Sequence, residues 1–350
     1  MREILSDAEW RGRMLSGKEA NGVGGFLFFG EEDYLKLHAL KTARQSLVTD
    51  PSLAVFNDME LDGSAPDFSA EALASALSAA PMMADRKLVV VSGLNLNDKK
   101  TAEIDALCEA ISLLDSYDFN CLILSVPAGG IDEGYLPKRP SAVLEKLCER
   151  LTPVRFARVG DAKLGAWALR HFSHYGVTTA DGVVPSLLQR CGRDMFVLSG
   201  EIEKLCFFAL AHGKTQVDVS DVEYVTCENE ELSAFALSNA VAAGDAPGAL
   251  DALGMMKARR VEPVIVLGEL SRTLGEMLSV RLLADAGQSP AAIASTLKLH
   301  EFRVKNYIKS VKSVPLAKLR AALRACVQAD SALKLSPTGY AEIEKLICML

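Results

Sequence analysis

The chain has few aromatic residues, no long apolar run and no closely spaced pair of cysteines. Aromatic side chains make up 6% of its 350 residues. No apolar stretch reaches the length of about 20 residues that a membrane span needs, and residues 1–7 lack the basic start and apolar segment of a signal peptide. The eight cysteines mostly have apolar neighbours, which indicates reduced core residues rather than metal ligands or disulfides. We therefore expect a cytoplasmic protein with no membrane segment.

The sequence also lacks the parts of a nucleotide site. Residues 25–29 read as a strand that feeds a helical segment, the opening of an α/β unit. The turn between them is Gly30-Glu31-Glu32-Asp33, whose three carboxylates would repel a triphosphate at the start of the helix. Two later strands, 88–91 and 122–126, end in Ser-Gly and Pro instead of a carboxylate that could bind Mg²⁺. We expect no nucleotide cofactor and no intrinsic catalytic site.

A metal site is also not expected. His171 and His174 lie one helical turn apart, as two metal ligands on a helix would. No third ligand or carboxylate motif stands near them, so a packing or surface role is favoured.

The length predicts two or three domains. Strand-like segments at 55–59, 88–91 and 121–126 alternate with helical ones, which predicts one α/β domain with a mostly parallel sheet over residues 1–151. Residues 152–227 read as a small domain of helices only, whose last short helix is capped by Asp218 or Ser220. After a charged linker at 228–231, seven helical segments predict a third, all-α domain of bundle type over residues 228–350.

Within the first domain, a proline precedes two methionines. Pro81 ends a helical segment that begins at Ser69 and places Met82 and Met83 at its tip. Methionine is flexible and polarizable, so an exposed pair would suit docking onto another protein. The alternative is that both side chains fold back into the core, and spacing alone favours this alternative.

Basic residues gather in one stretch of an acidic protein. Between Lys298 and Lys334 there are nine basic and two acidic residues, a local balance of +7, which leaves −14 for the rest of a chain whose net charge is −7. This stretch is either a local phosphate-binding face or an ordinary solvated helix surface. Residues 291–304 have the pattern of a helix-turn-helix, and Lys305, Lys309 and Lys312 share one face of its second helix.

Four stretches, in order along the chain, carry a resemblance to a known family. They are residues 26–32, 80–91, 192–205 and 299–305, and with them the chain resembles the delta subunits of bacterial DNA polymerase III. The resemblance implies an AAA+-like (P-loop-type) N-terminal α/β domain, a small helical lid domain and an all-α collar domain. It also implies that ATP is neither bound nor hydrolysed.

The resemblance further implies partners and the residues that meet them. Delta subunits bind and open the beta sliding clamp for loading onto primed DNA, and an apolar pair at a helix tip enters a pocket of the clamp; Met82 and Met83 fall on that pair. The collar would join the ATPase (tau/gamma) subunits and delta prime in a hetero-pentamer of the DNA polymerase III holoenzyme, whose nucleotidyltransferase activity the chain would share only by association. Contacts to primer-template DNA are expected from Lys305, Lys309, Lys312, Lys334 and Tyr340, whose ring could stack on a base if exposed.

Two other classes of protein remain to be distinguished. A helix-turn-helix regulator would read duplex DNA with residues 291–311, although these helices lack a cluster of Arg, Asn and Gln. An ATPase would need a phosphate site, which the sequence does not offer.

Overall fold

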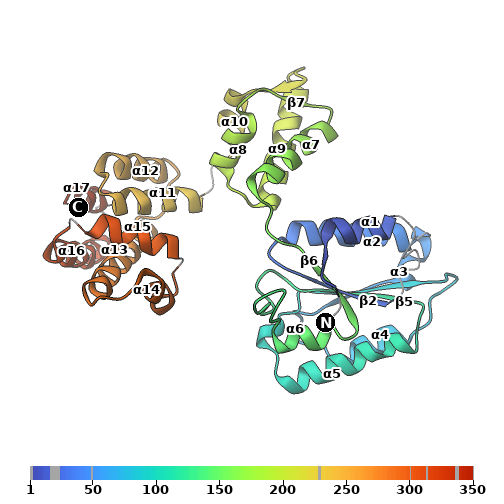
Figure 1. Ribbon diagram of the computed structural model, residues 1–350. Coiled ribbons are helices and arrows are strands. Elements are labelled where there is room, and N and C mark those ends of the chain that lie inside the picture. Colours follow the sequence, from blue (N-terminus) through green and yellow to red (C-terminus); the bar gives the residue numbers. More distant parts are fainter. Residues whose placement is uncertain are drawn as a thin grey trace. The chain divides into compact units, whose positions relative to one another are not determined.

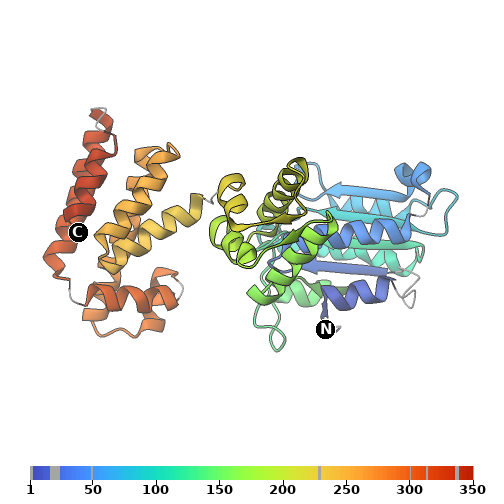
Figure 2. The same cartoon turned by 90° about the horizontal axis from the view of Figure 1, so that it is seen from above.

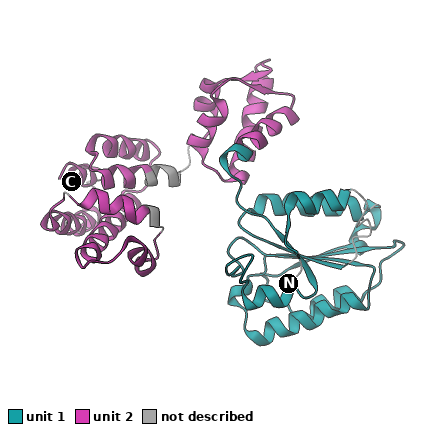
Figure 3. Ribbon diagram, viewed as in Figure 1, with its two compact units in different colours: residues 1–164 teal, residues 165–350 magenta. Residues whose placement is uncertain are grey.

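The computed structural model describes residues 3–15, 24–48, 50–227, 230–299, 301–312, 314–335 and 339–349. The chain divides into two compact units, Met1–Leu164 and Gly165–Leu350 (Figure 3). The boundary between the units lies inside helix α7 (Asp161–His174).

A six-stranded sheet forms the centre of the first unit. Its strand order is β1-β6-β2-β5-β4-β3, and every neighbouring pair is parallel. The strands are β1 (Leu5–Ser6), β2 (Gly24–Phe29), β3 (Asp58–Asp62), β4 (Lys87–Ser92), β5 (Asn120–Ser125) and β6 (Leu151–Arg155).

Helices cover both faces of this sheet (Figures 1 and 2). Side chains alternate between the two faces along a strand, so Phe26 and Phe28 pack with Trp10 of one helical layer, while Leu27 and Phe29 pack in the opposite layer. The first layer contains α1 (Asp7–Leu15) and α2 (Asp33–Leu47), and the second contains α4 (Ala70–Ser78), α5 (Thr101–Ser112) and α6 (Ala142–Leu147). The prediction of an α/β domain with a parallel sheet is confirmed.

Two details of this unit differ from the sequence-based expectation. Residues 55–59 are not one strand, because Ala54–Asn57 forms a short helix, α3, and β3 begins only at Asp58. The expected domain boundary after residue 151 falls at the start of β6, which pairs with β1 and β2 and therefore belongs to the first unit.

The helices of the predicted lid follow β6. They are α7 (Asp161–His174), α8 (Val183–Cys191), α9 (Met195–Ala211) and α10 (Val219–Val225). The expectation of helices only is wrong in one respect, since β7 (Thr178–Thr179) and β8 (Gln216–Val217) form a two-stranded parallel pair. Asp218 is the N-cap of α10, where its carboxylate accepts a hydrogen bond from the Asp221 N–H.

The predicted collar is all helical, as expected. Its helices are α11 (Glu230–Ala243), α12 (Ala246–Ala258), α13 (Pro263–Asp285), α14 (Pro290–Leu297), α15 (Glu301–Val311), α16 (Leu316–Leu335) and α17 (Ala341–Met349). They share one apolar core, to which α13 contributes Leu270, Leu274 and Met277. The expected fold class, a parallel α/β unit followed by helices that include an all-α C-terminal region, is thereby confirmed, while the division into an α/β, a lid and a collar domain stays a proposal.

None of the helices in the described parts of the chain combines the length and apolarity needed to traverse a lipid bilayer.

Candidate functional site

The two methionines lie on an exposed turn, the methionine tip (residues 79–86), that follows helix α4. Ser69 caps the start of α4 by accepting the Ala72 N–H, and Leu73 and Leu77 bury its inner face against the sheet. The helix ends at Ser78, and Met82 and Met83 then expose 45% and 88% of their surface. The interpretation that both methionines belong to the core, which spacing alone favoured, is wrong.

Buried polar side chains hold the end of α4, from which the tip extends. Lys87 Nζ donates to the carbonyls of Ala76 and Ala79, and Asn120 Nδ2 donates to the Leu77 carbonyl at 2.8 Å. These carbonyls belong to the last turn of the helix and its cap, where intrahelical donors run out. Burial lowers the pKa of the Lys87 ammonium, although the negative end of the helix dipole favours a cation there.

Asn57 of helix α3 fixes the tip itself. Its amide donates to the Met82 carbonyl at 2.9 Å and accepts the Met82 N–H at 2.8 Å. Met83, the next residue, has a φ of +50°, a left-handed conformation that is costly for a residue with a side chain. The two hydrogen bonds therefore anchor the tip directly beside its strained residue.

The turn between β2 and α2, where a phosphate-binding loop would lie, is filled by the buried side chain of Lys36. Its ammonium donates to the carbonyls of Gly30 and Val126, both at 2.7 Å, and to Asp33 Oδ1 at 2.8 Å. Burial lowers the pKa of this ammonium, and the neighbouring Asp33 partly offsets that effect. The carboxylate of Asp33 also accepts the Ala128 N–H.

The backbone of the same turn is closed against strand β6. Gly30 has a φ of +111°, and a Cβ there would lie 2.4 Å from the Phe156 carbonyl oxygen. The Glu32 N–H donates to that oxygen at 3.1 Å, and the Phe156 N–H donates to the Phe29 carbonyl at 2.8 Å. The Glu32 N–H of this turn already donates to a protein carbonyl, so it links the turn to the end of β6 and is not directed at a phosphate-binding site.

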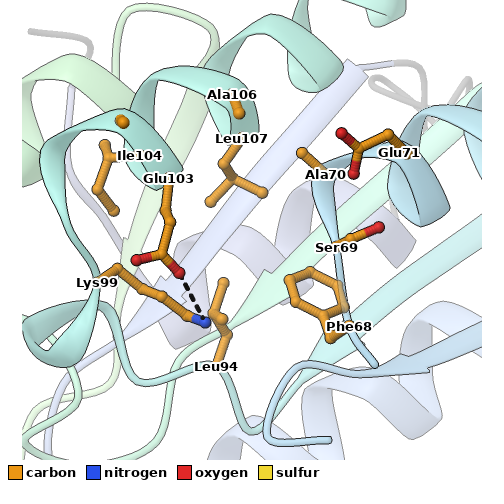
Figure 4. A pocket seen from close by; sticks show the side chains of 11 residues that line it. Phe68, Ser69, Ala70, Glu71, Leu94, Lys99, Glu103, Ile104, Ala106 and Leu107 are labelled. Atoms are coloured by element: carbon orange, nitrogen blue, oxygen red, sulfur yellow. Dashed lines mark ion pairs between the residues drawn. The ribbon is translucent and has the colours of Figure 1, made fainter. Parts of the chain in front are cut away.

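A pocket of about 310 Å³ opens elsewhere in the first unit, at the start of α4 (Figure 4). Phe68, Leu94 and Leu107 give it an apolar lining, and Lys99 and Glu103 pair at 3.3 Å on its wall. Lys99 is the one basic side chain among the described lining residues, and it is already paired. The pocket lies at the opposite end of α4 from the methionine tip and offers no cradle for phosphates.

The histidine pair in α7 has a packing environment. His171 stacks on Trp167 with ring centroids 5.1 Å apart, and its Nε2 lies 3.2 Å from Ser199 Oγ. Burial lowers the pKa of His171 below its ordinary value, and the nearby His174 adds to this. No group of three or more potential metal ligands exists among the residues that the structure describes.

None of the eight cysteines forms a disulfide, and five of them are buried.

The two helices expected for the predicted helix-turn-helix are α14 and α15, and α15 contributes to the apolar core of the C-terminal helices. Val304, Tyr307 and Val311 are buried along one side of it, and the hydroxyl of Tyr307 donates to Glu276 of α13 at 2.9 Å. Burial raises the pKa of Tyr307 to about 12. Helix α15 therefore presents only its remaining surface to other molecules.

The candidate DNA contacts fall into two groups. Lys305, Lys309 and Lys312 are all exposed on α15 or just after its end. Lys334 is exposed at the end of α16 and pairs with Asp330 at 2.7 Å, while residues 336–338 of the adjoining loop lie outside the described residues.

Tyr340 differs from the expectation of an exposed ring. It is half-buried against the collar core, and its hydroxyl donates to the Val261 carbonyl. Lys257 Nζ lies 5.7 Å from the ring centroid. The exposed ring face that base stacking requires is therefore reduced.

Sequence reasoning missed Asn57, Lys36 and Lys87. Asn57 lay inside a segment interpreted as a strand. Lys87 bonds to the end of the preceding helix, and one partner of Lys36, the Val126 carbonyl, comes from a distant part of the chain. A lysine within an apolar strand pattern, such as Lys87 before Leu88, was the one local signal available.

The architecture described above is a parallel α/β unit followed by a mostly helical region. Residues 231–347 match the family described as DNA polymerase III delta subunit, C-terminal domain. The chain is 25% identical over 303 residues to DNA polymerase III subunit delta of Bacillus subtilis, covering 80% of this chain and 79% of that one. It is similar in structure to the Bacillus subtilis DNA clamp loader delta protein (YqeN), with a TM-score of 0.63 and 19% identity over 97% of this chain and 98% of that chain. The resemblance to the delta subunits is confirmed.

Proposed function

We propose that this chain serves a bacterial clamp loader as its delta subunit, binding the beta sliding clamp and opening it for loading onto primed DNA. The match of the collar residues and the names of the Bacillus subtilis relatives support a role in replication clamp loading. In this role the chain is a cytoplasmic component of the DNA polymerase III holoenzyme and has no catalytic site of its own.

One observation carries the assignment of the clamp-binding site: the exposure of Met82 and Met83 on a turn that two hydrogen bonds from Asn57 hold in place. Two large apolar side chains in water are unfavourable unless a partner covers them. Fully burying a methionine is worth about 1.5–3 kcal/mol, and Met83 has the larger share of its surface still to bury.

The mechanism we propose is conformational. A ligand shifts an equilibrium only through its different affinities for the two states, so the methionine tip must bind the open clamp more tightly than the closed clamp. The turn filled by Lys36 supports the absence of ATP binding by this chain. Energy from ATP then has to come from the tau/gamma subunits that, with delta prime, complete the collar.

Primer-template DNA is the partner we assign to the exposed basic side chains Lys305 and Lys309 of α15, Lys312 just after it, and Lys334 at the end of α16. Lysines on one surface neutralise phosphates and release counterions without reading sequence. Tyr340 is not assigned a stacking role, since its ring packs on the collar and its hydroxyl is bonded.

The test is clamp binding by a Met82→Ala/Met83→Ala variant of the full chain, measured by surface-immobilised clamp. Each truncation should cost about 1–3 kcal/mol of binding free energy if the pair is a hot spot, with the larger loss at Met83. Met255 and Met349 are also exposed, on the collar, so Met255→Ala/Met349→Ala is the matched control and should bind normally. A double variant at the tip with wild-type affinity would remove the assignment.

The regulator alternative has a different signature. A helix-turn-helix regulator would bind duplex DNA by itself and prefer one sequence, whereas the proposed subunit would bind DNA with little preference and mainly in the assembled loader. A gel-shift titration of the isolated chain against random and selected duplexes separates the two.

A further inference from the structure

Helix α3, next to the methionine tip, turns its apolar side chains outward. Val55 and Phe56 expose 82% and 50% of their surface, whereas Asn57 exposes only 4%. This is the reverse of an ordinary surface helix, which buries its apolar face and exposes its polar one. Asn57 is buried because its amide bonds to the Met82 backbone, whereas Val55 and Phe56 leave half or more of their surface exposed.

The two exposed segments are joined by the hydrogen bonds of Asn57. Because both polar atoms of its amide bond to the Met82 backbone, at 2.9 and 2.8 Å, Phe56 and Met83 each lie one residue away from a bonded pair. Val55 and Phe56 therefore lie in a segment that is hydrogen-bonded to the segment carrying Met82 and Met83, and all four side chains are exposed.

We propose that α3 is the second half of the clamp-binding surface, where Val55 and Phe56 contact the beta sliding clamp beside the two methionines. Asn57 is the positioning residue that fixes α3 and the methionine tip relative to each other. This inference rests on the proposed function, because it takes the clamp as the occupant of a surface continuous with the methionine tip. Binding hot spots are enriched in rigid aromatic anchors, and Phe56 supplies the aromatic ring that the flexible methionines lack.

The role of Asn57 follows from the cost of ordering. A mobile tip loses conformational entropy when it binds, which weakens the binding free energy. A tip that is already ordered in the free protein does not have that loss on binding. Asn57 fixes the residue before Met83, whose left-handed backbone would otherwise relax. Its loss should weaken binding without removing any side chain that touches the clamp.

The first experiment measures clamp affinity for a Val55→Ser/Phe56→Ser variant of the full chain. We expect at least about tenfold weaker binding, with only a small decrease in the unfolding midpoint, because Val55 is 82% exposed and Phe56 has half of its surface in water. Tyr135, an exposed aromatic residue on another loop of the same unit, provides the control Tyr135→Ser, which should bind as wild type. Wild-type affinity of the Val55→Ser/Phe56→Ser variant would overturn the contact role of α3.

The second experiment is a double-mutant cycle between Asn57→Ala and Met83→Ala. If Asn57 acts by positioning the tip, it should weaken binding about tenfold in the wild-type background and much less when Met83 is already truncated. Asn57→Asp, which keeps the acceptor for the Met82 N–H but not the donor to its carbonyl, should fall between. Equal losses in both backgrounds would show a general structural effect and overturn the positioning role.

The outcomes separate the two proposals. If Met82→Ala/Met83→Ala binds the clamp normally, the proposed function fails and this inference fails with it. If that variant loses binding while the α3 variant keeps it and the cycle is additive, only the present inference fails.

Discussion

Replacing Lys36 by methionine tests whether its ammonium is a structural part of the first unit. The substitution keeps most of the aliphatic stem and removes three hydrogen bonds, to Gly30, Val126 and Asp33. Hydrogen bonds that involve a charged group are worth about 1.5–3 kcal/mol each, and buried carbonyls left without a donor carry a further penalty. Part of this is offset because a buried ammonium no longer has to be desolvated, so we expect a net loss of about 2–4 kcal/mol in the free energy of unfolding.

The assay is urea unfolding followed by the fluorescence of Trp10, which is buried in the first unit. A Trp167→Phe background removes the other of the two tryptophans. Lys41 is exposed on the same helix, so Lys41→Met is the matched control and should change stability by less than about 0.5 kcal/mol.

Two results would refute the reasoning about Lys36. One is an unfolding midpoint of Lys36→Met equal to that of Lys41→Met, which would mean that the ammonium of Lys36 contributes nothing to the stability of the first unit. The other is stabilisation of the wild-type chain by ATP, since a ligand that binds only the folded state raises its stability with concentration. Such stabilisation would show that the turn accepts phosphates despite Lys36.

Two further predictions concern pH and salt. The pKa of His171 is lower in the folded protein than its ordinary value of 6.5. As the pH falls from 6.5 through the folded pKa, the unfolded state binds more protons than the folded state, so the free energy of unfolding should decrease over that window. Urea unfolding at several pH values should show this decrease, and the His171→Gln variant should show a smaller one. A change with the opposite sign would contradict the packing role. For the collar, replacing Lys305, Lys309 and Lys312 by Gln should weaken primer-template binding by the assembled loader and reduce its salt dependence by about 0.9 in the logarithmic slope per lost phosphate contact. Lys345→Gln, on another exposed helix surface, is the control, and an unchanged slope in the triple variant would exclude this face.

Most of the fold could be predicted because its signals are local. The runs Phe26–Phe29 and Leu88–Val91 are continuous apolar strands, as expected for a parallel sheet covered on both faces. Helix α3 could not be predicted as easily, because Val55 and Phe56 have high strand propensity. Asp50 and Pro51 nevertheless gave a helix-start signal, since Asp50 accepts the Ser52 N–H and Pro51 opens the turn that leads into α3.

The candidate site was harder to predict because its geometry depends on contacts between distant residues. Spacing placed Met82 and Met83 after a helix but could not decide their exposure, which depends on how the end of α4 is held. That support comes from Asn57 and Lys87, and the Asn57 contact spans 25 residues. The burial of Tyr340 could not be predicted for the same reason, because its hydroxyl bonds to Val261, which lies between α12 and α13 and is distant in the sequence.

The buried polar groups of the first unit favour one way of regulating the proposed clamp binding. Lys36 closes the turn where a nucleotide would act, and Asn57 and Lys87 hold the methionine tip in one conformation. A tip fixed in this way offers no internal element through which a nucleotide bound by this chain could change its affinity. Under the proposed function, control by ATP must then come from partner subunits that cover or uncover a preformed surface, so the isolated chain should bind the clamp without nucleotide and the assembled loader should bind it only with nucleotide. Equal clamp affinity of the assembled loader with and without ATP would show that the surface is always accessible and would exclude this form of control.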